Sequence, residues 1–186
     1  MTRFSFLVLQ PLPDLGSEDD IRRTLDLVKS CGYDGVELNL TPATFDYLDR
    51  LVRWLSESGL TMPSWCTGEA YGEGLCMSSP DAAVRKRAVK RLIEYLDAAR
   101  QFQAILVVGM MQGLRSDEPD SDVANGRIIE SLKEVGSSAE AKGVEFVLEP
   151  VNHLQVGFNN SVAEVLQLIE AIGSPAIKPM VDTVHM

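Results

Sequence analysis

Short apolar runs alternate along the chain with longer segments in which apolar residues recur every three or four positions. Several of the runs are continuous rather than alternating, which is typical of strands buried on both faces. The runs lie at residues 4–9, 35–40, 60–65, 104–108, 144–148 and 177–181. The pattern therefore predicts six strands, with an amphipathic helix between each strand and the next.

The expected helices also carry boundary signals. Capping boxes begin at Ser17 and Ser161, and the third helix is expected to start with a cap at Ser79 and Pro80 at the first helical position. Glycines follow the last apolar position of the other four helices, at 32, 59, 143 and 173. These signals place each helix between two of the apolar runs.

Strand-helix alternation of this kind predicts right-handed βαβ units and a parallel sheet. The two candidate α/β architectures are an open doubly wound sheet and a (β/α)8 TIM barrel. A doubly wound nucleotide binder would carry a glycine-rich turn after its first strand, but residues 10–13 here read Gln-Pro-Leu-Pro. The barrel is therefore favoured.

The length of the units bears on completeness. The strand starts imply about 35 residues per unit, so eight units would need about 280 residues, which is within the range of TIM barrels. The chain has 186 residues and stops as the sixth strand ends. We therefore expect one incomplete TIM-barrel domain over residues 1–186, truncated after the sixth strand.

The charge balance excludes some classes of partner. The chain has 17 Lys and Arg against 27 Asp and Glu, for a formal net charge of −10. This acidity argues against nucleic acid and against anionic membranes. No apolar run approaches the roughly 18–20 residues of a membrane span. Three cysteines without a C-x-x-C pair, Cys31, Cys66 and Cys76, indicate reduced thiols in a cytoplasmic protein.

Candidate chemistry lies at the ends of the strands, where barrels place their catalytic groups. Glu149 and Asp182 follow the fifth and sixth apolar runs, and both histidines of the chain, His153 and His185, are close to them in sequence. Carboxylates and imidazole from neighbouring strand ends predict a divalent-metal site. A solvated loop residue or a helix cap is the alternative for either carboxylate, and His153 is interpreted as a loop residue.

Other strand ends are more ambiguous. Trp65 and Cys66, after the third run, are as well suited to packing the barrel interior as to contacting a ligand. Glu37 is either part of the pocket floor or a hydrogen-bonding structural residue, and we favour the structural role. Met110 and Met111 are interpreted as core.

Four stretches carry a resemblance to a known family. The chain resembles the xylose isomerase-like TIM barrels, in particular the sugar phosphate isomerase/epimerase group, which includes ketose 3-epimerases, hydroxypyruvate isomerases and inosose dehydratases. The two weaker stretches are GYDGVEL at 32–38 and SSPD at 78–81. The two specific ones are LEPVN at 148–152 and VDTVHM at 181–186.

The resemblance implies a ligand set and a set of substrate contacts. In such enzymes a divalent ion, commonly Mn²⁺, with Mg²⁺, Co²⁺ or Zn²⁺ as alternatives, is held by carboxylates that correspond to Glu149 and Asp182. The histidine of the D-x-x-H motif contacts substrate oxygens. The expected substrate contacts are therefore His185, Asn152, Gln155, Trp65 and Cys66, the last two as an apolar wall.

The sequence also departs from the family pattern. Gln155 stands where a second glutamate is common, and His153 stands where an arginine is common, so a ketose substrate should not be transferred directly. The family's ligands from a seventh and an eighth strand have no counterpart here. Two protein ligands would hold an ion weakly, so we expect either a fragment of a longer product or completion by another chain.

The expected function is a divalent-metal-dependent isomerase or epimerase that acts on a sugar, sugar phosphate or keto-polyol through a metal-bound enediolate. Glu149 would move the proton while it also binds the ion. The alternatives are an inosose dehydratase-type lyase and a non-catalytic barrel fragment or binding protein. An abasic-site endonuclease is least favoured, because that site needs histidines at strand ends that carry Trp65, Cys66 and Met110 here. The expected partners are a small-molecule sugar or polyol ketone and further copies of the chain.

Overall fold

The computed structural model describes residues 2–185 and contains a six-stranded parallel sheet. The strands pair in strictly sequential order, each with the strand before it in the chain. They are β1 (Ser5–Val8), β2 (Gly35–Asn39), β3 (Ser64–Cys66), β4 (Ile105–Val108), β5 (Phe146–Leu148) and β6 (Ile177–Pro179). A doubly wound sheet would reverse its strand order at a switch point, so this order confirms the TIM-barrel type. Met186, the last residue of the VDTVHM stretch, lies outside the described residues.

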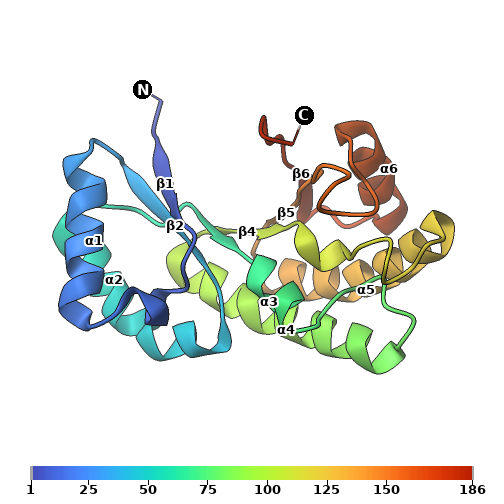
Figure 1. Ribbon diagram of the computed structural model, residues 1–186, viewed down its shortest axis with the longest axis horizontal. Helices are drawn as coiled ribbons and strands as arrows, with labels where there is room; N and C mark the ends of the chain where they lie inside the picture. Colours follow the sequence, from blue (N-terminus) through green and yellow to red (C-terminus); the bar gives the residue numbers. More distant parts are fainter. Residues whose placement is uncertain (1, 186) are drawn as a thin grey trace.

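Helices line the convex side of the curved sheet, which is open between β1 and β6 (Figure 1). The α-helices are α1 (Glu18–Ser30), α2 (Leu48–Ser58), α3 (Gly68–Gly72), α4 (Ala82–Phe102), α5 (Ser121–Lys142) and α6 (Val162–Ile172). Short 3-10 helices are η1 (Leu12–Leu15), η2 (Pro42–Tyr47) and η3 (Met110–Gln112). The main hydrophobic core lies between the sheet and these helices, as in a βα barrel.

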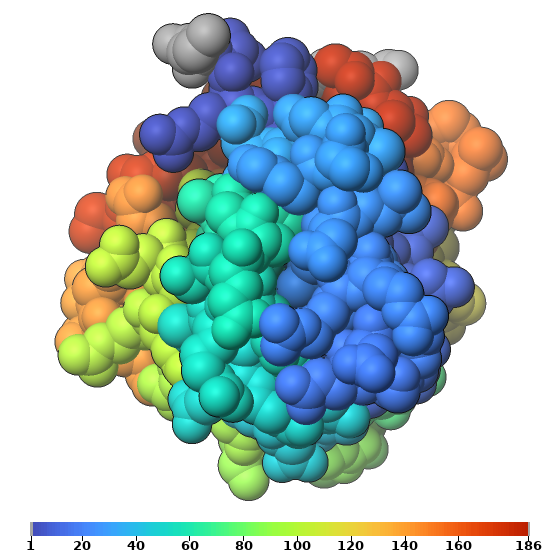
Figure 2. Space-filling view, turned by 90° about the vertical axis from the view of Figure 1, so that its left-hand side faces the viewer, coloured from blue at the N-terminus to red at the C-terminus, as the bar shows by residue number. Residues whose placement is uncertain are grey.

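The N-terminal third of the chain forms one end of the molecule. Figure 2 faces this end and shows the blue to teal residues covering it, where α1 and α2 pack against each other. Ile21, Leu25 and Val28 of α1 are buried at the helical spacing seen in the sequence. Among residues 2–185, no helix has the length and apolar character needed to cross a membrane.

Several of the expected elements differ from the observed ones. The runs at 144–148 and 177–181 give shorter strands, Phe146–Leu148 and Ile177–Pro179. The third strand was expected at residues 60–65 but spans Ser64–Cys66. Pro63 has no N–H to donate to a ladder, and Thr61 forms only an isolated bridge with Gly35. The second helical segment is divided, because η2 ends at Tyr47 and α2 begins at Leu48.

The helix boundaries follow the sequence signals with one correction. Both capping boxes are present, at Ser17 and at Ser161. The expected cap at Ser79 is wrong, because Asp81 caps α4 and accepts a hydrogen bond of 2.7 Å from the N–H of Ala83. Pro80 therefore precedes the helix. The side chain of Asp81 reaches the free N–H groups of the first turn, which is the function of an N-cap.

Candidate functional site

A pocket of about 530 Å³ opens at the carboxyl ends of the strands. This is the end at which barrel enzymes assemble their sites. Every strand, or the residues directly after it, contributes to the wall. The lining residues are Leu7, Leu9, Glu37, Asn39, Cys66, Thr67, Gly68, Val107, Gly109, Met110, Glu149, Met180, Val181, Asp182, Thr183 and His185.

Two carboxylates and an imidazole converge in this pocket. His185 Nε2 lies 3.6 Å from Glu149 Oε1 and 3.8 Å from Asp182 Oδ2. One potential ligand atom from each of the three residues lies within 4.8 Å of the other two. All three side chains are partly buried, with exposed fractions between 13% and 27%. The group is therefore close enough to act on one small ligand or ion.

The ends of β5 and β6 fix the positions of these groups. Glu149 directly follows β5, and its N–H donates to the carbonyl of Val108 at 3.0 Å. Met180 directly follows β6 and donates to the carbonyl of Leu148, also at 3.0 Å. After Met180 the chain turns, and the N–H of His185 donates to the carbonyl of Asp182 at 3.1 Å. This turn brings the imidazole back over the two carboxylates.

Asn152 determines which nitrogen of His185 carries the proton. The Oδ1 atom of Asn152 accepts from the N–H of Leu154 at 3.0 Å, so its amide nitrogen faces the imidazole. That nitrogen lies 2.8 Å from His185 Nδ1, which therefore acts as the acceptor. In the neutral ring the proton is then on Nε2, and the N–H points toward Glu149 and Asp182. His185 accordingly presents a hydrogen-bond donor to the pocket, not a lone pair.

The acidity of Glu149 is strongly perturbed in this pocket. Burial, together with the negative charge of Asp182, raises the pKa of Glu149 from 4.5 to about 7. A carboxyl group with such a pKa exchanges protons readily near neutral pH, which suits a general base.

Gly109 makes room for the Glu149 carboxylate. This glycine follows β4, and a Cβ atom placed on it would collide with Glu149 Oε2 and come within 3.1 Å of Val151 Cγ2. The close approach of these two side chains therefore favours glycine at this position. The sequence pattern does not reveal this role, because the neighbour that excludes a side chain is on another strand.

Cys66 and Glu37 line the pocket nearer the sheet. Burial, then the negative charges of Glu37 and Glu149, raise the pKa of Cys66 to about 12, so its thiol is neutral at physiological pH. Glu37 accepts hydrogen bonds from the hydroxyls of Ser5 and Ser64 on the two neighbouring strands. The structural role favoured for Glu37 from the sequence agrees with these contacts.

Comparison with known proteins identifies the family. The sequence profile of the xylose isomerase-like TIM barrel matches residues 25–186. The chain belongs to this family. An L-ribulose 3-epimerase from Mesorhizobium japonicum is 32% identical in an alignment of length 178 that covers 91% of this chain and 57% of that protein. A D-psicose 3-epimerase from Ruminiclostridium cellulolyticum is 26% identical in an alignment of length 177 that covers 91% of this chain and 59% of the relative.

A solved structure of an L-ribulose 3-epimerase superposes with a TM-score of 0.82 and 26% identity. The superposition covers 100% of this chain and 62% of the other. In the two sequence alignments, the chain spans 57–59% of the length of the curated epimerases. Within that span it has the strand order and helix layer of a xylose isomerase-like barrel.

The donor set of this xylose isomerase-like chain fits a hard divalent cation. Carboxylate oxygens are the ligands preferred by Mn²⁺ and Mg²⁺, and the group of Glu149, Asp182 and His185 supplies two carboxylates. The Nε2–H of His185 faces the same space and suits a substrate oxygen. The arrangement thus offers a place for an ion and, beside it, a hydrogen-bond donor for an oxygen atom of a small ligand.

The other residues expected as substrate contacts do not all lie at the pocket. Asn152 contacts His185, and Cys66 lines the pocket. Gln155 is exposed and accepts from Asn152 at 3.2 Å. Trp65 is fully buried and packs edge-on against Phe102 of α4, with ring centroids 5.3 Å apart. Because successive residues of a strand face opposite sides, Trp65 lies between the sheet and the helices, and only Cys66 faces the pocket.

Proposed function

We propose that this chain carries the substrate and metal site of a divalent-metal-dependent epimerase or isomerase of ketoses or related keto sugars. Glu149 and Asp182 would hold the ion, with Mn²⁺ as our first choice. When bound, the ion supplies Lewis-acid polarisation of the substrate carbonyl. The observation that carries the proposal is the convergence of Glu149, Asp182 and His185 in one pocket at the strand ends.

The roles of the residues follow from their geometry. Epimerisation at the carbon beside a carbonyl begins when a base removes the proton from that carbon and the electron pair moves into an enediolate. Glu149, whose carboxylate lines the pocket beside Asp182 and His185, would accept this proton. Return of a proton to the opposite face of the same carbon inverts its configuration. The donor at His185 Nε2 would hydrogen-bond a substrate oxygen and hold the enediolate in place.

Several further features support a small polar substrate. A pocket of about 530 Å³ has the size of small-molecule sites in general. The relatives at 32% and 26% identity are named L-ribulose and D-psicose 3-epimerases, so these ketoses are the first substrates to test. The formal charge of −10 disfavours nucleic acid as the partner.

Three free cysteines fit the cytoplasmic location that we propose.

The direct test is proton exchange. The chain is incubated with Mn²⁺ and L-ribulose or D-psicose in D₂O, and deuterium at C3 is followed by NMR. We expect Mn²⁺-dependent exchange that Glu149→Gln abolishes while the variant keeps its circular dichroism spectrum. Exchange that persists at the parent rate in Glu149→Gln would remove the role given to Glu149.

Two other outcomes would replace the proposal with one of its competitors. Sugar binding without exchange, in protein that holds Mn²⁺, would favour a binding protein. Loss of water from the sugar in place of epimerisation would favour a lyase that uses the same carboxylates.

A further inference from the structure

A buried amide network connects the backbone of Glu149 to residues outside the pocket. Gln112, fully buried at the end of η3, donates from Nε2 to the carbonyl of Glu149 at 3.0 Å and to that of Gly109 at 3.2 Å. Its Oε1 accepts from Asn159 Nδ2 at 3.0 Å. Asn159 Nδ2 also donates to Asn125 Oδ1 of α5 at 3.1 Å.

The chemistry of the partners fixes the orientation of this network. Both groups that face Gln112 Nε2 are main-chain carbonyls, so only the NH₂ side of the amide can face them. The oxygen of Gln112 must then face Asn159. Asn159 can donate a hydrogen bond to this oxygen only from its own NH₂ group. Asn159 is 4% exposed and has a φ of +55°, in the left-handed region that asparagine tolerates better than most residues. The local backbone therefore adopts an uncommon conformation where it delivers this donor.

The network completes the anchoring of Glu149. The N–H of Glu149 donates to Val108 of β4, and its carbonyl accepts from Gln112, four residues further along the chain from Val108. Both main-chain polar groups of Glu149 are thus bonded to one segment, which runs from the last residue of β4 to the last residue of η3. Gly109 lies between these two contacts and beneath the carboxylate. Contacts with this one neighbouring segment therefore set the direction of the Glu149 side chain.

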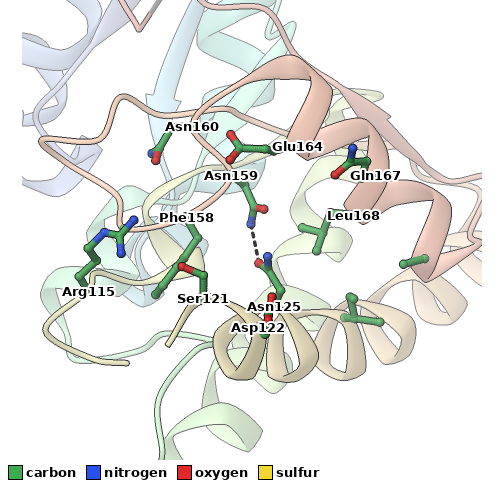
Figure 3. Close-up of a pocket in the computed structure, with 13 residues that line it drawn as sticks. Arg115, Ser121, Asp122, Asn125, Phe158, Asn159, Asn160, Glu164, Gln167 and Leu168 are labelled. Carbon is green, nitrogen blue, oxygen red and sulfur yellow. Dashed lines mark hydrogen bonds between the residues drawn. The ribbon is translucent and has the colours of Figure 1, made fainter. Parts of the chain in front are cut away.

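The far end of the network lies in a second pocket. This pocket, of about 360 Å³ between α5 and α6, is lined in part by Asn125, Asn159, Glu164 and Leu168. Figure 3 shows Asn159 and Asn125 turned toward each other across it, joined by their hydrogen bond. The β5–α6 loop that carries Asn159 is thereby joined to α5 as well as to Gln112.

We propose that Gln112 is a positioning residue for Glu149, and that Asn159 holds Gln112 in its working orientation. This inference rests on the proposed function, because it concerns the placement of the carboxylate assigned there to the ion and the proton. Gln112 contacts neither ion nor substrate. It acts by fixing the carbonyl of Glu149, so its loss would allow the first residue after β5 to rotate or shift.

The test uses Gln112→Met, which keeps the length of the side chain and removes its hydrogen bonds. Native-state hydrogen exchange, followed by NMR without metal, measures the opening of individual amides. We expect the Glu149 amide to exchange about ten-fold faster relative to the amides of β2, because a buried hydrogen bond beside it is lost. In parallel, an electron paramagnetic resonance titration with Mn²⁺ should show about ten-fold weaker binding.

Tyr95→Phe is the matched control. The Tyr95 hydroxyl donates at 2.8 Å to the carbonyl of Leu40, the first residue after β2, just as Gln112 donates to the first residue after β5. This variant likewise removes a buried side-chain hydrogen bond to a main-chain carbonyl, one bond where Gln112→Met removes two. We expect it to accelerate exchange at Leu40, whose N–H donates to Cys66, and to leave the Glu149 amide and Mn²⁺ affinity unchanged.

A second variant keeps the test decisive if Gln112→Met does not fold. Asn159→Asp places a carboxylate oxygen against Gln112 Oε1, so two acceptors face each other. The Gln112 amide cannot relieve this by flipping, because its oxygen would then face two main-chain carbonyls. It should produce the same local acceleration at Glu149 on a smaller scale. Acceleration at Glu149 that only equals the global change would overturn the positioning role. Absence of Mn²⁺ binding in the parent chain would instead contradict the proposed function, while the metal-free exchange data would still decide the role of Gln112.

Discussion

The identity of residue 109 is set by a side chain forty positions away. Gly109→Ala would force the Glu149 carboxylate aside, because the new Cβ collides with Oε2. We expect Mn²⁺ affinity to fall by about ten-fold or more, with a modest loss of stability. Isothermal titration with Mn²⁺ and thermal melting would measure both.

Gly126→Ala provides the control for this substitution. Gly126 lies inside α5 with open space around the position of a Cβ, so alanine should raise helix stability by about 0.5–1 kcal/mol and leave metal binding unchanged. Equal Mn²⁺ affinities for the two variants would show that Gly109 does not shape the site.

The acidity of Glu149 links stability to pH. Its pKa rises from 4.5 to about 7 on folding, so the folded chain retains a proton that the unfolded chain has released over this interval. The free energy of unfolding of the metal-free protein should therefore fall as pH rises from about 4.5 to 7, by an amount on the order of 3 kcal/mol. In the metal-free protein, the ionised Glu149 carboxylate therefore lowers the free energy of unfolding.

A neutral isostere should remove this cost. We expect metal-free Glu149→Gln to melt at a higher temperature than the parent at about pH 8 and at nearly the same temperature at about pH 4, where Glu149 is protonated. Differential scanning calorimetry at the two pH values makes the comparison. A gain of equal size at both pH values would show that the carboxylate charge is not its source.

At the level of elements, α6 depends on a cap that lies beside the amide network. The Ser161 hydroxyl accepts from the N–H of Glu164, and the Glu164 carboxylate accepts from the N–H of Ser161 at 2.9 Å. Ser161→Ala should lower the free energy of unfolding by about 1 kcal/mol, which urea denaturation would detect. Ser137→Ala, at an exposed hydroxyl inside α5, should change stability by less than half as much.

The elements themselves could largely be predicted from sequence. The apolar runs at 35–40 and 104–108 became β2 and β4 within one residue at each end, and the boxes at Ser17 and Ser161 start their helices. Where prediction failed, a competing local interaction prevailed, as with Asp81 in place of Ser79. The run at 60–65 ends before Cys66 and does not indicate which side of the sheet each residue faces, so it could not show that Trp65 packs on α4 while Cys66 lines the pocket.

The sequence predicts only part of the site, because some of its contacts join residues that are distant along the chain. Glu149 and Asp182 stand out because each follows an apolar run, and parallel strands bring their carboxyl ends to one edge. The places of Gly109 and Gln112 depend on contacts between segments about forty residues apart, and one-dimensional spacing does not record them.

For the whole molecule, the open side of the sheet is the dominant feature. Among the described residues, β1 and β6 each pair with one neighbour, so each presents a free edge. Exposed apolar side chains accompany the β1 edge, at Phe4, Phe6, Leu7 and Leu9. Free edges with apolar flanks favour association with another strand. We therefore expect concentration-dependent self-association of this chain in sedimentation velocity runs.

A matched pair of substitutions tests where the association occurs. Phe4 beside β1 and Leu27 on α1 are both 63% exposed, so replacement by lysine changes charge and apolar surface comparably. Phe4→Lys should shift the distribution toward monomer, whereas Leu27→Lys should leave it nearly unchanged. A parent chain that sediments as a single monomer at all concentrations would contradict the expectation.

The sequential strand order also has a consequence for synthesis. Paired residues stand 27 to 41 positions apart, from Leu38 with Trp65 to Ser64 with Ile105, so every strand pairs with the one translated just before it. The entropy of closing such loops varies slowly with length, so the five closures have similar costs. Among residues 2–185, no strand pairs with a distant part of the chain. The sheet can therefore grow during translation one βα unit at a time, with the most recent strand edge receiving the next strand.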